Sequence, residues 1–179
     1  MAEKNVRNLN HPVWNIYDQL KTARLNVLYY EEKLCSSETT QMWMQIILAA
    51  TVPSSAIAGF KVWDFWIGEY AWEFLIYFSS LIAFIQPFLG LPKKSKKYDE
   101  LVTGYKILFY DLQDIRQKIE EDQAYTNTHK KLFKAAKDRR KKLEVQETGI
   151  KVDKKLRKKC QDAVSVELPG KQFYIPNED

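Results

Sequence analysis

Two stretches of the chain lack charged residues, while the segments on either side of them carry most of the charge. The first reads QMWMQIILAATVPSSAIAGF at residues 41–60, and the second reads FLIYFSSLIAFIQPFLGLP at residues 74–92. A helix needs about 20 mostly apolar residues to cross the hydrocarbon core of a bilayer, and each stretch has about that length. In a soluble domain of this size, too few other helices would remain to cover two such helices on all sides. The pattern therefore favours two membrane spans, at residues 41–60 and 74–92.

Aromatic and basic residues beside these stretches predict an orientation. Trp63, Trp66 and Trp72 lie in the link between them, as is typical of rings at the level of the lipid headgroups. The link contains one lysine and three carboxylates, whereas KKSKK follows the second stretch at residues 93–97. Because basic residues favour the cytoplasmic side, we expect a multi-pass membrane protein with both termini in the cytoplasm.

Apolar residues recur at alternating spacings of three and four before the first stretch and again after the second. Such spacing is typical of the a/d seam of a heptad helix, and it predicts amphipathic helices at residues 11–37 and 97–122. These helices could pair antiparallel within one chain, or with copies from neighbouring subunits. In the second case the residues of the oligomer seam would include Val13, Leu20, Val27, Leu34, Leu101, Leu108 and Leu112.

The predicted fold class is an all-α membrane protein, in which a helical hairpin of two spans is flanked by long amphipathic cytoplasmic helices. Residues 1–122 would form this domain, and residues 123–179 would form a basic helical tail. In the tail, Leu132, Ala136 and Leu143 predict a third helix beside KDRRKK, and VDKKLRKKC predicts a short fourth. The basic clusters are more often solvated helix faces than binding sites.

Catalytic constellations are absent from the sequence. His11 and His129 stand alone, without other ligands at metal-site spacing, and the six glycines form neither a P-loop nor a dinucleotide fingerprint. Cys35 and Cys160 lie far apart, so a disulfide framework is not indicated. The sequence therefore predicts a protein that is not an enzyme and that needs no metal or cofactor.

Polar and small residues inside the apolar stretches are the candidates for function, because an unpaired polar group is costly in a bilayer. Thr51, Ser55 and Gly59 repeat at every fourth position, which lets helix backbones approach closely. The same side chains could line a pore, and the sequence leaves both possibilities open. Glu69 and Glu73 would share a face at the outer mouth. The candidates for packing or pore lining are Gln45, Thr51, Ser54, Ser55, Gly59, Ser79 and Gln86.

The layout resembles the SLATT family, a two-transmembrane effector domain of bacterial antiphage defence. The resemblance is carried by VWNIYDQLKTARLNVLYYEEKL with Trp14 and Arg24, by two closely spaced apolar stretches, by the basic stop, and by YDELVTGYKILFYDLQDIRQKI. It covers residues 10 to 122, and it consists of topology and residue type without a catalytic signature.

The resemblance implies a homo-oligomeric effector in the bacterial inner membrane, which permeabilises or depolarises the bilayer when triggered and so causes abortive infection. It also implies a regulatory sensor from the same operon, either a reverse transcriptase with its nucleic acid, as in retrons, or a nucleotide-synthesising enzyme, as in CBASS. The basic tail would suit contact with nucleic acid or with anionic lipid. The alternatives are a phage-derived, holin-like hole former and a membrane-anchored coiled-coil scaffold without pore activity.

Overall fold

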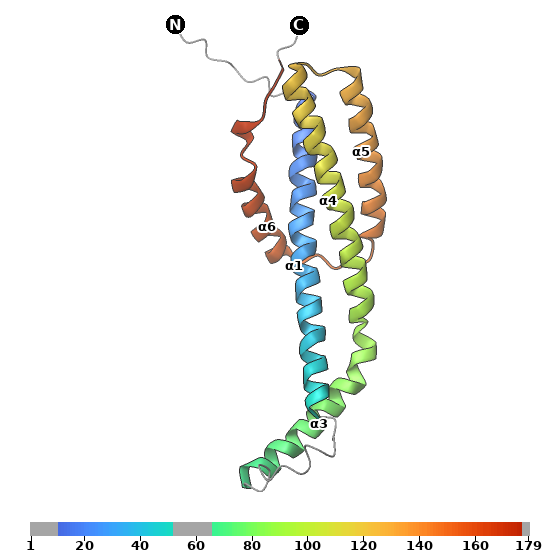
Figure 1. The fold of residues 1–179 in the computed structure, drawn as a ribbon, viewed down its shortest axis with the longest axis vertical. Helices are drawn as coiled ribbons and strands as arrows, with labels where there is room; N and C mark the ends of the chain where they lie inside the picture. Colours follow the sequence, from blue (N-terminus) through green and yellow to red (C-terminus); the bar gives the residue numbers. More distant parts are fainter. Residues whose placement is uncertain (1–10, 52–65, 177–179) are drawn as a thin grey trace. The chain divides into compact units, whose positions relative to one another are not determined.

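The computed structural model describes residues 11–51 and 66–176, with the backbone alone at positions 50, 51, 66–73, 75 and 76. Every regular element of these residues is a helix, which confirms the all-helical part of the predicted fold class (Figure 1). The elements are α1 (Val13–Thr51), α3 (Trp66–Leu89), α4 (Leu91–Asp122), α5 (Asn127–Gln146), α6 (Lys154–Glu167) and the 3₁₀ helix η2 (Gly170–Gln172).

The chain divides into two compact units. One comprises Met1–Glu32 together with Tyr98–Asp179, and we call it the bundle unit; the other comprises Lys33–Lys97, and we call it the apolar unit. Helices α1 and α4 contribute residues to both. The structure therefore divides the chain differently from the predicted boundary after residue 122, because the tail folds together with the two seam helices.

In the bundle unit, α1 and α4 run antiparallel and bury their seams against each other. The Tyr30 ring stacks on the Tyr105 ring with centroids 6.0 Å apart, while Arg24 lies over the Phe109 ring at 5.5 Å. Residues later in α4 thus contact residues earlier in α1, as expected of antiparallel helices. The buried core residues of the two helices include Val13, Ile16, Tyr17, Leu20, Ala23, Val27, Leu101, Leu108, Leu112, Ile115 and Ile119.

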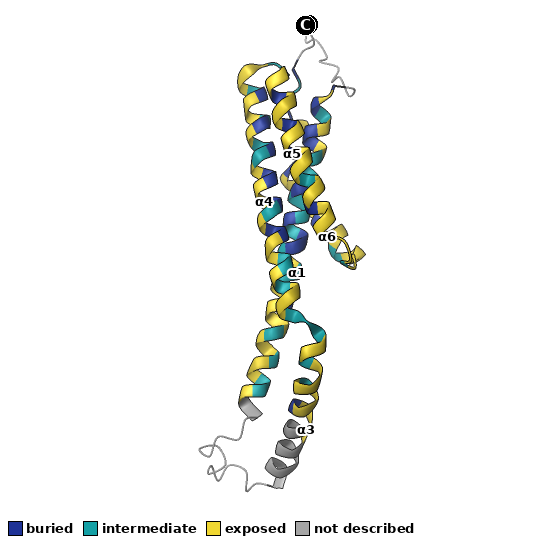
Figure 2. Ribbon diagram, turned by 90° about the vertical axis from the view of Figure 1, so that its right-hand side faces the viewer, coloured by how far each residue is buried: buried dark blue, intermediate teal, exposed yellow. Residues whose placement is uncertain are grey.

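Helix α5 packs on this pair through Phe133, Ala136 and Leu143, which are all buried (Figure 2). Two of them, Ala136 and Leu143, are among the apolar residues from which the sequence predicts a helix in the tail. A Cβ atom at Gly104 would lie 2.4 Å from Leu143 Cδ2, so the absence of a side chain at this position of α4 lets α5 approach closely. The two helices therefore share one packed interface.

Helix α6 and the chain end cover α1 from another side. The Asp153 side chain caps α6 by accepting from the backbone N–H groups of Lys155 and Leu156, as a helix N-cap residue does. Cys160 and Val164 are buried in the core, and the ring of Phe173 stacks on Tyr17 with centroids 4.1 Å apart. The predicted short fourth helix thus exists, and it belongs to the bundle.

In the apolar unit, Ser37 of α1 and Ser95 of α4 share a hydrogen bond of 2.9 Å. Helix α3 ends at Leu89, and Gly90 adopts a left-handed conformation with φ of +57° before α4 begins. A glycine here is the usual way to terminate a helix, because it has no Cβ to clash. The predicted second span, residues 74–92, is consequently interrupted.

The predicted membrane topology is corrected by the structure. Within residues 11–51 and 66–176, no helix is at once long enough and apolar enough to cross a bilayer. The uncharged run of α3 begins at Phe74 and stops at Leu89, which falls short of the roughly 20 residues that a span needs. Of the first predicted span, only residues 41–51 lie in a described helix. A multi-pass protein of the bacterial inner membrane with both termini in the cytoplasm is therefore not supported.

Candidate functional site

Helix α3 carries a stripe of large apolar side chains that face outward. They recur at spacings of three and four residues, so they share one face of the helix. The exposed fraction reaches 70% at Phe84 and 78% at Phe88. Phe74 stacks on Phe78 with ring centroids 6.0 Å apart, so the rings contact one another along the stripe. Its members are Phe74, Tyr77, Phe78, Leu81, Phe84, Ile85 and Phe88.

The opposite face of α3 is the more polar one. Ser79 is buried and Gln86 is half-buried, and the two lie seven residues apart, or about two helical turns. A helix on the surface of a water-soluble protein has the reverse arrangement, with apolar residues inward and polar residues outward. Although Ile82 on the inner side is half-buried too, α3 exposes its large aromatic side chains and buries Ser79, and in this sense it is inside-out with respect to water.

The end of α1 adds to the exposed apolar surface of this unit. Met42, Trp43 and Ile46 are each about half exposed, with Trp43 at 57%. Single exposed apolar residues are common on proteins, but contiguous apolar patches are rare on monomers and mark surfaces that bind lipid or protein. The apolar unit is thus the first candidate site, and its exposed apolar surface suits binding to lipid or to another protein chain.

The predicted polar candidates lie in different surroundings in the structure. Gln45 is exposed on α1, and Ser79 and Gln86 share the inner face of α3. Thr51 lies at the last position of α1, and Glu69 and Glu73 lie in α3, but the side chains of these three are not among those described. Ser54, Ser55 and Gly59 lie outside the described residues.

The predicted oligomer seam is used within one chain. Leu34 is half-buried in the apolar unit, whereas the other six residues lie in the core of the bundle unit. Because α1 and α4 already cover each other, these side chains are not available to a neighbouring copy. The antiparallel alternative within one chain is the one that the structure adopts. The six residues are Val13, Leu20, Val27, Leu101, Leu108 and Leu112.

Both histidines have structural roles that spacing along the sequence did not indicate. The backbone N–H of Val13 donates to His11 Nδ1 at 3.2 Å, so His11 caps the start of α1. The backbone N–H of Thr126 donates to His129 Nδ1 at 3.1 Å, and His129 Nε2 lies 3.3 Å from Asp122. His129 thereby joins the end of α4 to the start of α5.

A group of tyrosines closes the end of the bundle unit nearest Glu32 and Tyr98. The Tyr105 hydroxyl donates to Glu147 Oε1 at 2.5 Å, and the backbone N–H of Asp153 donates to the Tyr29 hydroxyl at 2.9 Å. Burial, followed by the negative charge of Glu147 and its hydrogen bond, raises the pKa of Tyr30 above its ordinary value. Both ends of the turn between α5 and α6 are therefore fastened to α1 and α4.

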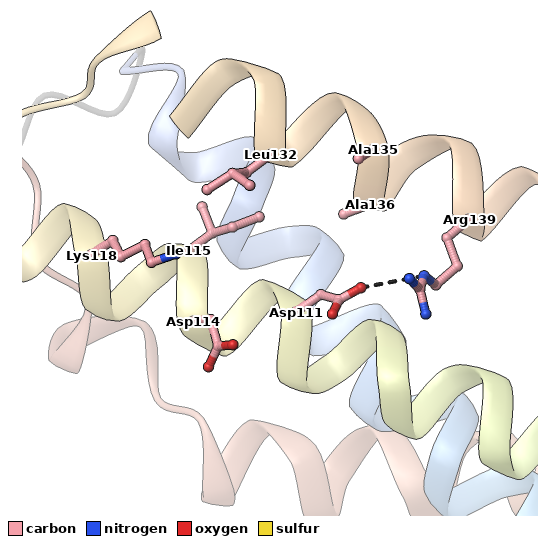
Figure 3. A pocket seen from close by; sticks show the side chains of 8 residues that line it. All are labelled: Asp111, Asp114, Ile115, Lys118, Leu132, Ala135, Ala136 and Arg139. Carbon is pink, nitrogen blue, oxygen red and sulfur yellow. Dashed lines mark ion pairs between the residues drawn. The ribbon is translucent and has the colours of Figure 1, made fainter. Parts of the chain in front are cut away.

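A shallow groove of about 200 Å³ runs between α4 and α5 (Figure 3). Ile115, Leu132 and Ala136 supply its apolar lining, and Asp111 and Arg139 pair across it at 3.3 Å. In the described part of the chain, no three His, Cys, Asp or Glu residues gather as they would around a metal ion. The groove lacks the enclosure that buries a small-molecule ligand, so it is a weaker candidate than the apolar face.

Comparison of the chain with protein-family models, with curated proteins and with solved structures found no match.

Proposed function

We propose that this chain is an effector of bacterial antiphage defence, which assembles with its own copies on a lipid bilayer and permeabilises or depolarises it. The observation that carries the proposal is the inside-out character of α3. Its exposed stripe includes Leu81, Phe84 and Phe88, while Ser79 faces inward. This exposed surface supports the proposal, which does not require a membrane-spanning helix.

Apolar surroundings make the arrangement favourable. An exposed phenylalanine side chain costs about 1.5–3 kcal/mol relative to a buried one, and α3 exposes several of them on one face. Contact with acyl chains or with a second copy would remove that cost. The inward polar groups would then serve as packing contacts, as small and polar residues do between helices in lipid. The surface therefore suits an association that disturbs the bilayer.

The resemblance to the SLATT family supports the biological setting. Under this proposal a sensor from the same operon, either a reverse transcriptase with its nucleic acid or a nucleotide-synthesising enzyme, restrains the effector until infection. Release would then lead to loss of membrane potential and to abortive infection. Co-expression of the neighbouring gene should suppress depolarisation, and its deletion should restore it.

Two further candidates share the same surface. A holin-like hole former would permeabilise bilayers without any sensor, whereas a coiled-coil scaffold would associate through the apolar unit and never change permeability. The scaffold is favoured by one observation, since α1 and α4 of the described chain pair through long heptad seams in a packed core. Permeability measurements separate it from the other two.

The proposal is tested by dye release from liposomes and by membrane potential in cells. Phe84→Gln with Phe88→Gln should abolish release, because it makes the exposed stripe polar while leaving the bundle core intact. Val145→Gln with Val166→Gln is the matched control, since both valines are exposed in the bundle unit. Equal release by both double variants would contradict the role of the apolar face, and no release by the wild-type chain would leave the scaffold.

A further inference from the structure

Positive charge is concentrated in one segment of the bundle unit. Residues 130–159 contain fourteen Lys and Arg residues against four Asp and Glu residues, although the whole chain has a net charge of only +5. The remainder of the chain is therefore net negative. This segment comprises most of α5, the following turn and the start of α6.

Four lysines form a row along α5. Lys130, Lys134, Lys137 and Lys141 are spaced by four, three and four residues, so they share one face, and all four are exposed. An adjacent side of the helix carries the buried residues His129, Phe133, Ala136 and Leu143, and Lys137 lies over the Phe133 ring at 5.3 Å. The lysine row is thus an exposed face of a helix that packs into the core through the neighbouring face.

Few of these charges are neutralised from within the described chain. Ion pairs join Arg139 to Asp111, Arg140 to Glu144, Lys141 to Asp138 and Lys159 to Glu32. The pair of Lys141 is exposed and 3.4 Å long, and exposed pairs contribute little. The row therefore keeps most of its charge available to a partner.

The two arginines of α5 are committed to contacts within the bundle. Arg139 pairs with Asp111 of α4, and Arg140 also donates to Gln19 of α1. The planar guanidinium forks that suit recognition of individual phosphates are therefore already engaged by side chains of the bundle, whereas the lysine ammonium groups of the row face solvent. Such hydrated point charges suit a diffuse layer of negative charge.

We propose that the lysine row of α5 docks the chain on the anionic headgroup surface of a bilayer. The proposal rests on the proposed function, in which a bilayer is the target of the apolar unit. Each Lys near an anionic surface contributes attraction, and the contributions of a row combine. The row lies on a fixed helix, since the Thr126–His129 contact holds its start and the Tyr105–Glu147 hydrogen bond holds its end.

Nucleic acid fits this surface less well. The only aromatic residue of α5 is Phe133, which is buried, and α6 has none. Within α5 and α6, bases would therefore find no exposed phenylalanine, tyrosine or tryptophan ring to stack on, and stacking supplies much of the affinity for single strands.

Co-sedimentation of the full chain with vesicles tests the inference. Wild-type protein should bind phosphatidylcholine vesicles more tightly when they also contain phosphatidylglycerol, and salt should weaken this gain. Replacing Lys130, Lys134, Lys137 and Lys141 with Gln should reduce affinity for the anionic vesicles by up to about a thousandfold, which is about fivefold for each lysine. Affinity for neutral vesicles should not change. The matched control replaces the same four lysines with Arg, and it should bind like wild type.

Three outcomes would overturn the inference. They are equal binding of the Gln variant and wild type to anionic vesicles, a loss in the Arg control as large as in the Gln variant, and a loss of binding to duplex DNA without any loss to vesicles. Circular dichroism of the Gln variant excludes unfolding as the cause. The proposed function can fail separately from this inference. If the wild-type chain docks on anionic vesicles but releases no dye, only the proposed function is overturned. If it releases dye without any preference for anionic vesicles, only this inference is overturned.

Discussion

The bundle unit and the apolar unit use the same kinds of side chain in opposite ways. In the bundle unit, Leu20, Leu108 and Ile119 are fully or almost fully buried, and lysines cover the outside. In the apolar unit, Phe84 and Phe88 point outward while Ser79 is buried. Apolar area is stable only where water is excluded, so the two units are built for different surroundings.

The contrast teaches that periodicity alone does not tell which face of a helix is covered. The seam of α4 and the stripe of α3 both repeat at spacings of three and four residues. One stripe meets a partner helix, and the other meets none among the described residues (Figure 2). The difference arises because α1 and α5 pack on the bundle part of α4, and Phe173 near the chain end also contacts it.

The largest effect should come from truncating the bundle core. Leu108→Ala should lower the free energy of unfolding by about 2–5 kcal/mol, because it leaves a cavity among packed residues. Leu81→Ala on the exposed stripe should change it by no more than about 0.5 kcal/mol in dilute solution. Urea unfolding followed by circular dichroism measures both. Equal losses would show that the two leucines have the same surroundings, and would remove the contrast.

Alkaline pH should destabilise the bundle unit selectively. Burial, with a smaller contribution from Glu120, raises the pKa of Tyr17 from 10.0 to about 12. Between these values the unfolded chain loses the proton while the folded chain keeps it, so stability falls as pH rises from about 10 and levels off above about 12. Two pKa units correspond to about 2.7 kcal/mol at most.

Tyr17→Phe is the matched variant for this titration. It should be less stable than wild type at neutral pH, because the hydrogen bond from Tyr17 to the Tyr174 carbonyl is lost. Its stability should also fall less steeply between pH 10 and 12, since one buried phenol is removed. Thermal unfolding across this pH range provides the measurement. Parallel curves of stability against pH for the two proteins would argue against Tyr17 as a source of the loss of stability at alkaline pH.

A smaller effect is expected where the turn between α5 and α6 is fastened. Tyr105→Phe removes the hydrogen bond to Glu147, whose carboxylate is only half-buried and can turn to water. A hydrogen bond to a charged group contributes about 1.5–3 kcal/mol, and we expect the lower end here. Hydrogen exchange should increase in α5 near Leu143 more than in α1 near Leu20. Uniform exchange through the unit would contradict a local fastening role.

The smallest effect concerns the groove between α4 and α5. Arg139→Gln removes the ion pair with Asp111, in which both side chains are more than a third exposed. Exposed pairs contribute about 0–1 kcal/mol, so stability should hardly change. If urea unfolding shows that the free energy of unfolding falls by more than about 2 kcal/mol, the groove contributes to stability as core residues do.

Much of the bundle was predictable from local pattern. The a/d spacing of α1 and α4 predicts the buried residues, because a helical period of 3.6 places them on one face. The capping roles of His11 and His129 are local, since each ring accepts from a backbone N–H group two or three residues away, and a search for metal-ligand spacing does not find them. The approach of His129 to Asp122 was not predictable, because it depends on the turn between α4 and α5. The second membrane span was predicted wrongly because hydropathy counts residues along the chain and does not show that α3 ends at Leu89, before Gly90.

The sequence by itself determined that the chain is helical, where its seams lie and which segment is most basic, because helix propensity, periodicity and charge are local properties. Only the tertiary structure decided that the two seams pair within one chain, that α5 and α6 join them, and that α3 turns its phenylalanines outward. Those outcomes depend on which distant segments meet, and contacts between distant segments are set by packing and chain connectivity, which no local pattern encodes.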